Sequence, residues 1–537
     1  MCSFNRYSDS LRSLNKMIVD SQWSWWSEFE VTGKKVELTF PVFTLSAISF
    51  AIFLYISWKS RSRLPPGPRG LPVLGYLPFL GANLLDEFTK MGQRFGPIFK
   101  LQLGSKTYVV ISSSDLAKVV LRDQDDTFAN RDPPVAGIAL TYGGKDITWS
   151  DNNTYLRNMR KVLMYEVMSH KNLEASLSFR RGGVRKTVKN VYETMGTEVD
   201  IGETAFSTLL RVITSIIWGK SFDEDEASNT LMVGFREVIT SAMMVLGTNN
   251  VSDYFPVLAR FDLQGVERKM KKEAQKLDGI FQKIIDDRVI SLKTKESVEQ
   301  QGRKDLLQVF LELKQENTES SFSDTQIKAL FMDFFVAGTH TTTTVTESTM
   351  RELLKKPDVM KKIQDELEQV VGLNNIVEEF HLPNLRYLDA TIKETFRLNP
   401  TLPLLVTRSP NKSCKIDKYI VPKGSNVFLN VWAIHRDPKY WDKPLEFNPN
   451  RFLNPDGNAK FDYNGLNTNF LAFGAGRRRC PGVPLSEKML MYLLASLLHS
   501  FNWTLPDVKE SDKLVPKKPK PLLAIPSQRL PDNNLYM

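Results

Sequence analysis

The stretch FGAGRRRCPG at residues 473–482 decides how this chain folds and what it binds. It places Cys480 in a glycine-rich loop, beside three arginines and ahead of an apolar helix expected over residues 483–500. Cationic neighbours and a helix N-terminus both favour a thiolate, and glycines let backbone N–H groups approach the sulfur. The loop alone fits a nucleophile, a metal ligand or a redox thiol. No CxxC or Cys/His pair has zinc spacing, and no βαβ pattern precedes the glycines, which disfavours zinc and dinucleotide binding.

The composition is that of a globular protein. The chain has 537 residues, of which 42% are hydrophobic and 25% charged, with a net charge of +10. This surplus favours an acidic partner or a membrane surface but is too dilute to indicate nucleic acid, so no nucleic-acid partner is expected. Three cysteines far apart in sequence disfavour a disulfide framework, and five histidines disfavour a multi-histidine metal cluster.

An uncharged segment, LTFPVFTLSAISFAIFLYISW at residues 38–58, predicts a single transmembrane anchor. At ~1.5 Å per residue its length matches a hydrocarbon core of ~30 Å, and a buried core helix seldom lacks charge for so long. The basic, proline-rich residues 59–70 follow as a stiff hinge. The positive-inside rule then puts residues 1–37 in the lumen and residues 71–537, the catalytic domain, in the cytosol.

Two further expectations depend on this orientation. Asn152, Asn250, Asn411 and Asn502 each begin an N-x-[ST] glycosylation sequence, yet a cytosolic body stays unmodified. Met17 opens a tryptophan-rich stretch suited to a membrane interface, so we expect it to be a sufficient start.

The sequence that follows the hinge, residues 71–537, predicts one large domain that is mainly α with small β-sheets (α+β) at one end. Alternation at residues 98–103 and 108–111 indicates strands, and helical periodicity dominates after Asp115. The longest helix begins at Ser323, whose capping box includes Gln326, and ends at Pro357.

The middle of this long helix conflicts with its own secondary structure. Residues 334–344, FFVAGTHTTTT, combine a glycine with β-branched hydroxyl residues that lower helix propensity. Such a conflict inside a strong element predicts a functional site. The alternative is a face of threonines that bond back to their own helix.

At this point the motifs match a known family. Residues 473–482 resemble the haem-binding signature of the cytochromes P-450. ETFR at 394–397, FNPNRF at 447–452 and AGTHTT at 337–342 resemble the family's ExxR, downstream arginine and oxygen-activation motifs, in the expected order. NVWAIHRDP at 430–438 is similar to the A-type plant microsomal enzymes, nearest to the plant family numbered seven hundred and six, which is associated with terpenoid and other specialised-metabolite oxidation.

The resemblance implies a cytochrome P-450 fold holding haem b, with the Cys480 thiolate as axial iron ligand. Phe473 and Gly476 belong to the same signature. The haem propionates are expected to meet three arginines, listed here: Arg478, Arg160 and Arg408. At Arg160 and Arg408 the alternative is a solvated side chain that binds no propionate.

One departure bears on this expectation. Leu156 stands where the family's C-helix usually has a tryptophan, so propionate binding there is weaker or compensated by Tyr155.

Glu394, Arg397 and Arg451 are expected to form a structural triad that steadies the cysteine loop. Glu394 and Arg397 are three apart and share one helix face, which suits an ion pair, and the helix is partly apolar. Breaking a buried pair of this kind is costly. A plain surface salt bridge is the alternative.

Thr341 and His340 are the expected catalytic residues, since splitting dioxygen requires protons. The family usually sets an acid beside the threonine, and here His340 replaces it. Histidine titrates near neutral pH, so we expect Thr341 to act directly and His340 only to tune proton supply. In the alternative, His340 turns away from the haem and bonds a backbone carbonyl.

The substrate pocket is expected from residues 133–146, 241–254 and 400–406 together with the central helix. These segments carry few charges and include Met243 and Met244, which suits an apolar small molecule of irregular shape. No acidic group is evident for a cationic ligand, so a terpenoid is favoured, followed by an alkaloid or a phenolic.

The sequence therefore predicts a haem-thiolate monooxygenase in the endoplasmic reticulum membrane, in contact with lipid. It inserts one atom of O2 into an apolar substrate. No flavin or nicotinamide domain is recognisable, so electrons come from NADPH through a separate NADPH-cytochrome reductase. The departure at His340 leaves a reductase-independent isomerase or dehydratase as an alternative, and a haem-binding protein without turnover as a third.

Overall fold

The computed structural model describes residues 44–49, 64–81, 83–219, 226–293, 305–315, 323–506 and 521–537, in two units that divide after Arg63. In the first unit a short helix covers residues 44–49. Most of the predicted anchor, the segment 1–37 and Met17 lie outside the described residues. Within the described part, no helix combines the length and the apolar character needed to cross a bilayer.

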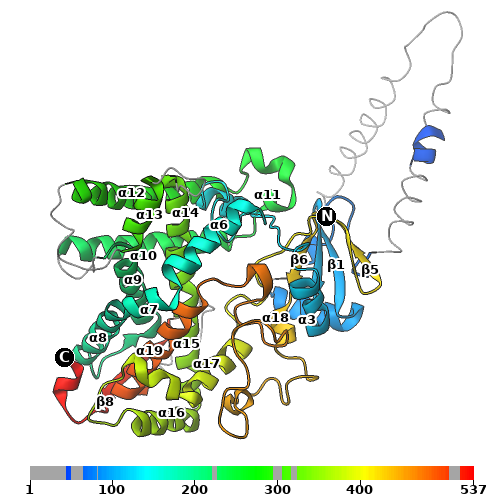
Figure 1. The fold of residues 1–537 in the computed structure, drawn as a ribbon. Coiled ribbons are helices and arrows are strands. Elements are labelled where there is room, and N and C mark those ends of the chain that lie inside the picture. The colour runs from blue at the N-terminus through cyan, green and yellow to red at the C-terminus, as the bar shows by residue number, and fades with distance from the viewer. Residues whose placement is uncertain are drawn as a thin grey trace, which may run out of the picture. The chain divides into compact units, whose positions relative to one another are not determined.

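The second unit is dominated by helices (Figure 1). They are α3 (Leu84–Phe95), α4 (Ser114–Lys118), α5 (Val135–Leu140), α6 (Thr154–Val162), α7 (His170–Ala175), α8 (Leu177–Glu193), α9 (Ile201–Trp218), α10 (Glu226–Leu246), α11 (Val251–Tyr254), α12 (Val266–Lys293), α13 (Leu306–Gln315), α14 (Asp324–Met332), α15 (Gly338–Lys355), α16 (Pro357–Val370), α17 (Arg386–Leu398), α18 (Val431–Ile434) and α19 (Val483–Ser500).

Three small sheets complete the unit. Their strands are β1 (Ile98–Leu103), β2 (Lys106–Ile111) and β6 (Asn426–Leu429) in the first sheet, β3 (Val199–Asp200), β8 (Leu523–Gln528) and β7 (Phe501–Thr504) in the second, and β4 (Cys414–Ile416) with β5 (Tyr419–Val421) in the third. β1 and β2 pair antiparallel, with Ile98 opposite Ile111, and β6 adds parallel to β2. The two predicted strands are confirmed.

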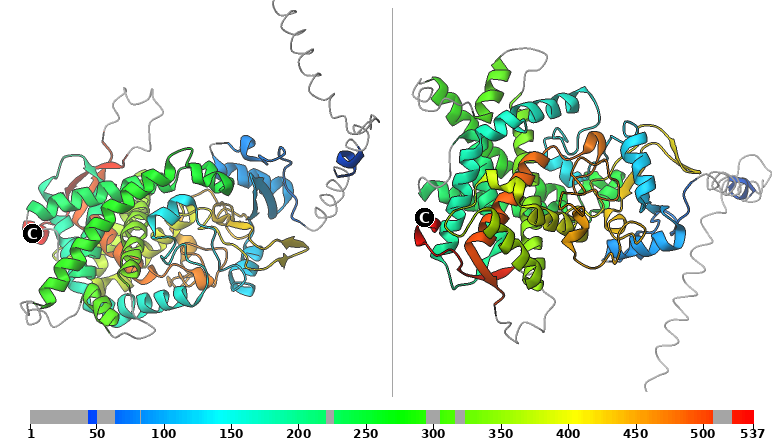
Figure 2. Two further views of the ribbon diagram at one scale, coloured as in Figure 1. Left: turned by 90° about the horizontal axis from the view of Figure 1, so that it is seen from above. Right: turned by 60° about the horizontal axis from the view of Figure 1, so that its bottom comes forward.

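The expectation that all sheets lie at one end is wrong. The β3–β8–β7 sheet lies near the C-terminus, away from the β1–β2–β6 sheet (Figures 1 and 2). It forms because β7 follows α19 directly and pairs antiparallel with β8 near the C-terminus, while β3 adds at the start of α9. β7 alternates over only four residues, β3 has only two, and β8 (LAIPSQ) begins with an apolar run, so periodicity does not reveal this sheet.

The predicted long helix is present and crosses the core. The Ser323 hydroxyl accepts from the Gln326 amide, and the Gln326 side chain accepts from the Ser323 amide at 2.7 Å, which completes the capping box. The helix runs through α14, a π-helical turn over Asp333–Ala337, and α15. The π turn falls where glycine and β-branched residues begin, and such turns are frequent at functional sites. α15 packs against α9, α17 and α19.

Candidate active site

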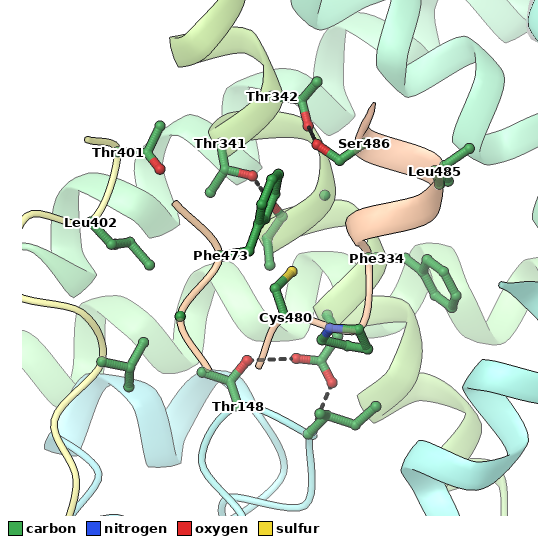
Figure 3. A pocket seen from close by; sticks show the side chains of 18 of the residues that line it. Thr148, Phe334, Thr341, Thr342, Thr401, Leu402, Phe473, Cys480, Leu485 and Ser486 are labelled. Atoms are coloured by element: carbon green, nitrogen blue, oxygen red, sulfur yellow. Dashed lines mark hydrogen bonds between the residues drawn. The ribbon is translucent and has the colours of Figure 1, made fainter. Parts of the chain in front are cut away.

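A cavity of about 290 Å³ lies between the central helix and the 473–482 loop (Figure 3). Its walls are mainly apolar and come from α9, α14, α15, the 401–406 loop and α19; examples are Leu209, Ile213, Phe334, Leu405 and Leu485. The Cys480 thiol points into it. The predicted loop at 400–406 therefore lines the cavity, through Thr401, Leu402, Leu405 and Val406.

Glycine is required in the cysteine loop at position 476. Gly476 has φ +69°, and a Cβ there would lie 2.4 Å from the Leu121 carbonyl oxygen and 2.5 Å from Asp125 Oδ1. The Cys480 amide donates to the Phe473 carbonyl at 3.0 Å, which closes the loop. Phe473 itself lines the cavity beside the sulfur (Figure 3).

The thiol environment differs from the sequence expectation. Cys480 is exposed to the cavity but enclosed by the protein, and this burial raises the pKa of its thiol above the ordinary value. The Gly482 amide, Arg160 and Arg479 act in the opposite direction. The expected thiolate-favouring groups are present, but enclosure outweighs them; a thiol that coordinates a metal is nevertheless deprotonated by the metal.

Four arginines line the same cavity. The predicted Arg160, Arg408 and Arg478 all line it, and Arg131 joins them. Arg478 donates to the carbonyls of Ala129 (2.6 Å), Ile147 (3.1 Å) and Ser150; Arg408 donates to Asp125 Oδ1 (3.0 Å) and the Ala475 carbonyl (2.8 Å); Arg160 donates to the Arg479 carbonyl (2.8 Å). Neither Arg160 nor Arg408 is therefore a solvated side chain.

Arg131 is a site residue that the sequence analysis missed. Its guanidinium donates to the carbonyls of Thr148 (3.1 Å), Val406 (2.8 Å) and Thr407 (2.7 Å). The bonds to Val406 and Thr407 span more than 270 residues of sequence, so no local pattern could reveal them.

Glu394, Arg397 and Arg451 are in contact. Arg397 donates to both oxygens of Glu394, at 2.6 and 2.8 Å, and both side chains are fully buried. Arg451 Nε reaches Glu394 Oε1 at 3.4 Å. Arg397 also donates to the carbonyls of His435 (2.8 Å) and Pro444 (2.7 Å). The alternative of a surface salt bridge is excluded, because all three groups are shielded from water.

His435 connects this triad to the cysteine loop and was also missed. The Leu471 amide donates to His435 Nε2 at 2.9 Å, and His435 Nδ1 faces the Arg397 carbonyl at 3.3 Å. Its ring stacks on Phe470. Burial lowers the pKa of His435 to about 3, helped by Arg397 and Arg436, so the ring is neutral. It lies in the 430–438 stretch, but only the fold reveals its partner.

The threonines of α15 have two kinds of contact. The hydroxyls of Thr339, Thr341 and Thr344 donate to carbonyls four residues earlier. These three threonines therefore bond back to their own helix, as the alternative in the sequence analysis states. Thr341 nevertheless lines the cavity (Figure 3). Its donation to the Ala337 carbonyl uses the hydroxyl proton and leaves the oxygen lone pairs available to accept hydrogen bonds. Thr342 also lines it and pairs with Ser486 of α19 at 3.2 Å.

His340 lies differently from Thr341. It is exposed and is not among the described residues that line the cavity. Burial of part of the ring lowers the pKa of His340, which Glu347 partly offsets. This placement agrees with the part of the alternative in which His340 turns from the cavity, but among the described residues its ring does not bond the expected backbone carbonyl.

The sequence and fold of the chain have clear relatives. The family pattern described as cytochrome P450 matches residues 65–530. The chain belongs to the cytochrome P450 family. It is 37% identical over 492 residues to a 7-ethoxycoumarin O-deethylase of Helianthus tuberosus, and 36% identical over 495 residues to a geraniol 8-hydroxylase of Catharanthus roseus. Each match covers 89% of this chain and 97% of the relative.

A solved structure shares the fold. A zebra fish cytochrome P450, determined with abiraterone, superposes with a TM-score of 0.67 and 24% identity, covering 83% of this chain and all of that one. The predicted P450 fold, mainly helical with small sheets, is confirmed. The chain is a haem-thiolate monooxygenase that acts on a small molecule with O2 and a redox partner. The likeness to the family numbered seven hundred and six stays a prediction.

The cavity of this P450 fits haem b. Arg131, Arg160, Arg408 and Arg478 lie close enough that burial and mutual repulsion lower the pKa of Arg131 well below its usual value and that of Arg478 to about 10. Of these four guanidinium groups, Arg408 alone forms an ion pair within the described part of the chain, with Asp125 at 3.0 Å. Two carboxylates in the cavity would offset the excess charge, and haem b carries two propionates. The enclosed Cys480 thiol supplies the axial donor.

The structure bears on the departure at Leu156 of this P450 through the position of Tyr155. Leu156 is buried in the core, and the Tyr155 hydroxyl donates to the Lys145 carbonyl at 2.6 Å. Tyr155 is not among the described residues lining the cavity. Compensation by Tyr155 therefore has no support in the structure, and weaker propionate binding at this position stays a prediction.

Asp333 is the third residue that the sequence analysis missed, and it corrects the expectation of an acid-free pocket. It lines the cavity from the π turn. Its oxygens accept from the Ile147 amide (2.7 Å) and the Thr148 hydroxyl (2.9 Å), as Figure 3 shows. Burial raises the pKa of Asp333 to about 6, although the two hydrogen bonds and the positive charge of Arg160 each lower it.

Two of the predicted pocket segments are wrong. Among the described residues, neither 133–146 nor 241–254 lines the cavity; Ile147 and Thr148, directly after the first segment, do. α5 packs on α10 and α12 instead, and Met244 is 61% exposed. Part of the apolar wall comes instead from Leu209, Val212 and Ile213 of α9, a segment that the sequence analysis did not include in the pocket.

Proposed function

We propose that this P450 oxidises a terpenoid of plant specialised metabolism, with alkaloids and phenolics as the next classes. The observation that carries the proposal is the apolar wall formed by α9, Phe334 and Leu402 above the cysteine. The carboxylate of Asp333 does not favour a cationic ligand, because both of its oxygens already accept hydrogen bonds. The named activities of the relatives on geraniol and on flavonoids support a hydroxylated apolar product.

Within this proposal, Cys480 ligates the haem iron and Arg131, Arg160, Arg408 and Arg478 hold the propionates. When bound, the haem supplies activation of O2 and insertion of one oxygen atom, which the thiolate promotes. The Thr341 hydroxyl donates a hydrogen bond to the Ala337 carbonyl. Its oxygen can accept a hydrogen bond from a proton donor in the cavity, and the hydroxyl relays that donor's proton. The apolar wall excludes bulk water from this position.

We assign a positioning role to the triad and to His435. His435 holds the amide of Leu471, which lies two residues before the cysteine loop, and Arg397 holds His435 at two points. Glu394 fixes the Arg397 guanidinium. The loop geometry around Cys480 therefore depends on buried groups that do not contact the substrate.

Electrons are proposed to come from NADPH-cytochrome reductase at a basic face. Arg157 and Lys161 are exposed on α6, whereas Arg477, exposed on the adjoining loop, is partly neutralised by Asp126 at 3.4 Å and Asp125 at 3.8 Å. The two elements are joined by the bond from Arg160 to the Arg479 carbonyl. Lys488 is partly neutralised by Glu379 at 3.4 Å and contributes less. An acidic partner suits this face.

We also propose attachment to the endoplasmic reticulum membrane, with residues 38–58 as a single anchor and the catalytic domain in the cytosol. A face of exposed apolar side chains supports this. Val73 and Val257 are 79% and 78% exposed, and Phe261 and Leu263 are also exposed. We call this set, with Leu74 and Phe79, the apolar face; its two segments meet where the Ser105 amide donates to the Tyr254 carbonyl at 3.0 Å.

Co-expression with a plant reductase tests the function. Terpenoids, alkaloids and phenolics are screened for a substrate-induced spectral shift, and products are then measured with and without NADPH. An oxygenated terpenoid formed only with NADPH is the expected result; product without NADPH would indicate the isomerase alternative. Cys480→Ser should abolish the red-shifted band of the reduced CO complex. If that band persists in Cys480→Ser, the assignment of the ligand is wrong.

A further inference from the structure

The polar side chains that line the haem cavity are engaged by other groups of the protein, with one exception. The four arginines donate to backbone carbonyls, and their remaining donors are assigned above to the haem propionates. Within the protein, hydrogen bonds join Thr148 to Asp333 (2.9 Å), Thr342 to Ser486 (3.2 Å) and Thr341 to the Ala337 carbonyl (2.7 Å). A substrate therefore meets few polar side chains that lack a partner.

Thr401 is the exception. It lines the cavity from the loop after α17 and is half-buried. Among the described lining residues it carries the one hydroxyl without a hydrogen-bond partner, and the protein does not enclose its oxygen completely. Figure 3 shows this hydroxyl directed into the cavity. Because it can both donate and accept, it is the group available to a polar atom of the substrate in an otherwise apolar site.

The loop that carries Thr401 is held in place by bonds to distant segments. Arg131 donates to the Val406 carbonyl at 2.8 Å, and the Trp432 amide donates to the Pro403 carbonyl at 3.0 Å. Pro403 itself restricts the backbone two residues after Thr401. A hydrogen-bonding group on a preorganised loop loses little conformational entropy when a ligand binds, so its bond contributes to selection among ligands.

Thr401 lies across the cavity from a hydrocarbon surface. Figure 3 shows Thr401 and Leu402 on one side, and Phe334 and Leu485 on the other. The Cys480 sulfur lies between these two sides in the same view. A molecule whose oxygen atom is bound by Thr401 therefore extends its hydrocarbon part toward Phe334, past the position that faces the sulfur.

We propose that Thr401 determines specificity by hydrogen-bonding an oxygen atom of the substrate, so that the substrate is a terpenoid that already carries a hydroxyl or carbonyl group. This inference rests on the proposed function and narrows it. The oxidised carbon belongs to the hydrocarbon part, remote from the existing oxygen, and an earlier reaction must have installed that oxygen. The step is the monooxygenation already assigned: a C–H bond becomes C–OH, the second atom of O2 leaves as water, and NADPH supplies two electrons through the redox partner.

The test uses the full-length haem-loaded protein and measures dissociation constants from the substrate-induced spectral shift. Each oxygenated ligand is paired with its parent hydrocarbon: menthol with p-menthane, thymol with p-cymene and, outside the terpenoids, 2-naphthol with naphthalene. Thr401→Val removes the hydroxyl at nearly constant volume, and Thr401→Ser retains it. The matched control, Thr407→Val, makes the same change in the adjoining residues of the chain, at a position that is not among the described residues lining the cavity.

The quantity that decides is the preference for the oxygenated member of each pair, the hydrocarbon dissociation constant divided by that of its partner. We expect Thr401→Val to lower this preference by about three- to tenfold, because one hydrogen bond is lost. Thr401→Ser and Thr407→Val should keep the preference of the wild type. A preference that Thr401→Val leaves unchanged, or that Thr401→Val and Thr407→Val lower equally, would overturn the proposal.

The outcomes also separate this proposal from the proposed function. Hydrocarbons that bind as tightly as their oxygenated partners would refute the role of Thr401 and leave the terpenoid class standing. Binding of the naphthol pair alone, with a preference that Thr401→Val lowers, would refute the terpenoid class and keep the role of Thr401. A lower haem content in Thr401→Val with an unchanged preference would show that the hydroxyl holds the haem instead, which overturns the proposal. No spectral shift with any of the six ligands would count against both.

Discussion

The Leu471 amide donates a 2.9 Å hydrogen bond to Nε2 of His435, two residues before the cysteine loop begins. Only the neutral ring can accept this bond while Nδ1–H faces the Arg397 carbonyl. Burial, with the charges of Arg397 and Arg436, holds the pKa of His435 at about 3 and keeps the ring neutral. The loop that carries Cys480 is therefore fixed to the triad helix by a group sensitive to acid.

Replacement of His435 should change the acid stability of the protein. Between pH 3 and the ordinary histidine pKa, the unfolded chain binds a proton that the folded protein does not, so the free energy of unfolding falls as the pH is lowered through this window, by at most about 1.4 kcal/mol per pH unit. His435→Phe retains the ring but cannot titrate. It should destabilise the protein at pH 7 by about 1–3 kcal/mol, because the Leu471 amide loses its acceptor.

Urea unfolding followed by haem absorbance measures both effects. The difference between wild type and His435→Phe should shrink as the pH falls from 6.5 toward 4. His435→Gln, whose carbonyl can accept from Leu471, should recover part of the loss at pH 7. A wild type and His435→Phe with parallel pH profiles would refute this role for the ring.

Asp333 predicts a pH dependence of the opposite sign. Burial raises the pKa of Asp333 to about 6, and that of the neighbouring Asp146 is raised by burial and by Asp333. Between the ordinary carboxyl pKa and pH 6 the folded protein keeps a proton that the unfolded chain releases. Its stability relative to Asp333→Asn should therefore fall as the pH rises through this window, by up to about 1.4 kcal/mol per pH unit.

The same unfolding series tests Asp333. Above pH 7 the difference between wild type and Asp333→Asn should be constant, because the carboxyl is then ionised in both folded and unfolded chains. Asp333→Asn should also loosen the Ile147–Thr148 segment, since one amide oxygen cannot replace two carboxylate acceptors. A difference that does not change between pH 4 and 7 would contradict the assigned shift.

Much of this molecule could be predicted from local sequence. The capping box at Ser323, the long helix to Pro357, the glycine at 476 and the Glu394–Arg397 pair depend on residues within a few positions of one another, and each has the expected geometry. The propensity conflict in the central helix coincides with a π turn that carries a cavity residue. Local chemistry predicts local structure.

The misses depend on contacts that only the fold creates. Arg131 meets carbonyls 275 and 276 residues away, and Asp333 meets Ile147, 186 residues away. The wall of the cavity was placed on the wrong segments because apolar stripes on α9 and α10 look alike in sequence, whereas packing buries one against the central helix and leaves Met244 on the other exposed. Periodicity identifies an apolar face but not its partner.

The orientation in the membrane predicts the absence of N-glycans. We expect no modification at Asn152, Asn250, Asn411 or Asn502, and Asn250 is only 2% exposed in the folded domain. Leu11→Asn, which creates Asn-Arg-Ser in the proposed lumenal segment, should by contrast be glycosylated. Electrophoretic mobility before and after deglycosylation measures both. A shift in the wild type, or no shift in Leu11→Asn, would contradict the proposed topology.

Thr341 offers the sharpest test of the proposed chemistry, because a matched residue lies one turn away. The hydroxyls of Thr341 and Thr344 both donate to the carbonyl four residues earlier, at 2.7 and 2.9 Å, but only Thr341 lines the cavity among the described residues. Loss of either hydroxyl removes the same helix bond, so the two alanine variants should have similar stability. They should differ in catalysis.

Thr341→Ala should bind substrate with an unchanged spectral shift but form about tenfold less product per NADPH consumed, with the electrons appearing as hydrogen peroxide, because proton delivery is lost. Thr344→Ala should remain near wild type, and Thr341→Ser should recover coupling since it restores the hydroxyl. His340→Ala should show a milder loss, because His340 lies outside the described lining of the cavity. Equal coupling in Thr341→Ala and Thr344→Ala would refute a role for the Thr341 hydroxyl and favour the isomerase alternative, in which no NADPH is required.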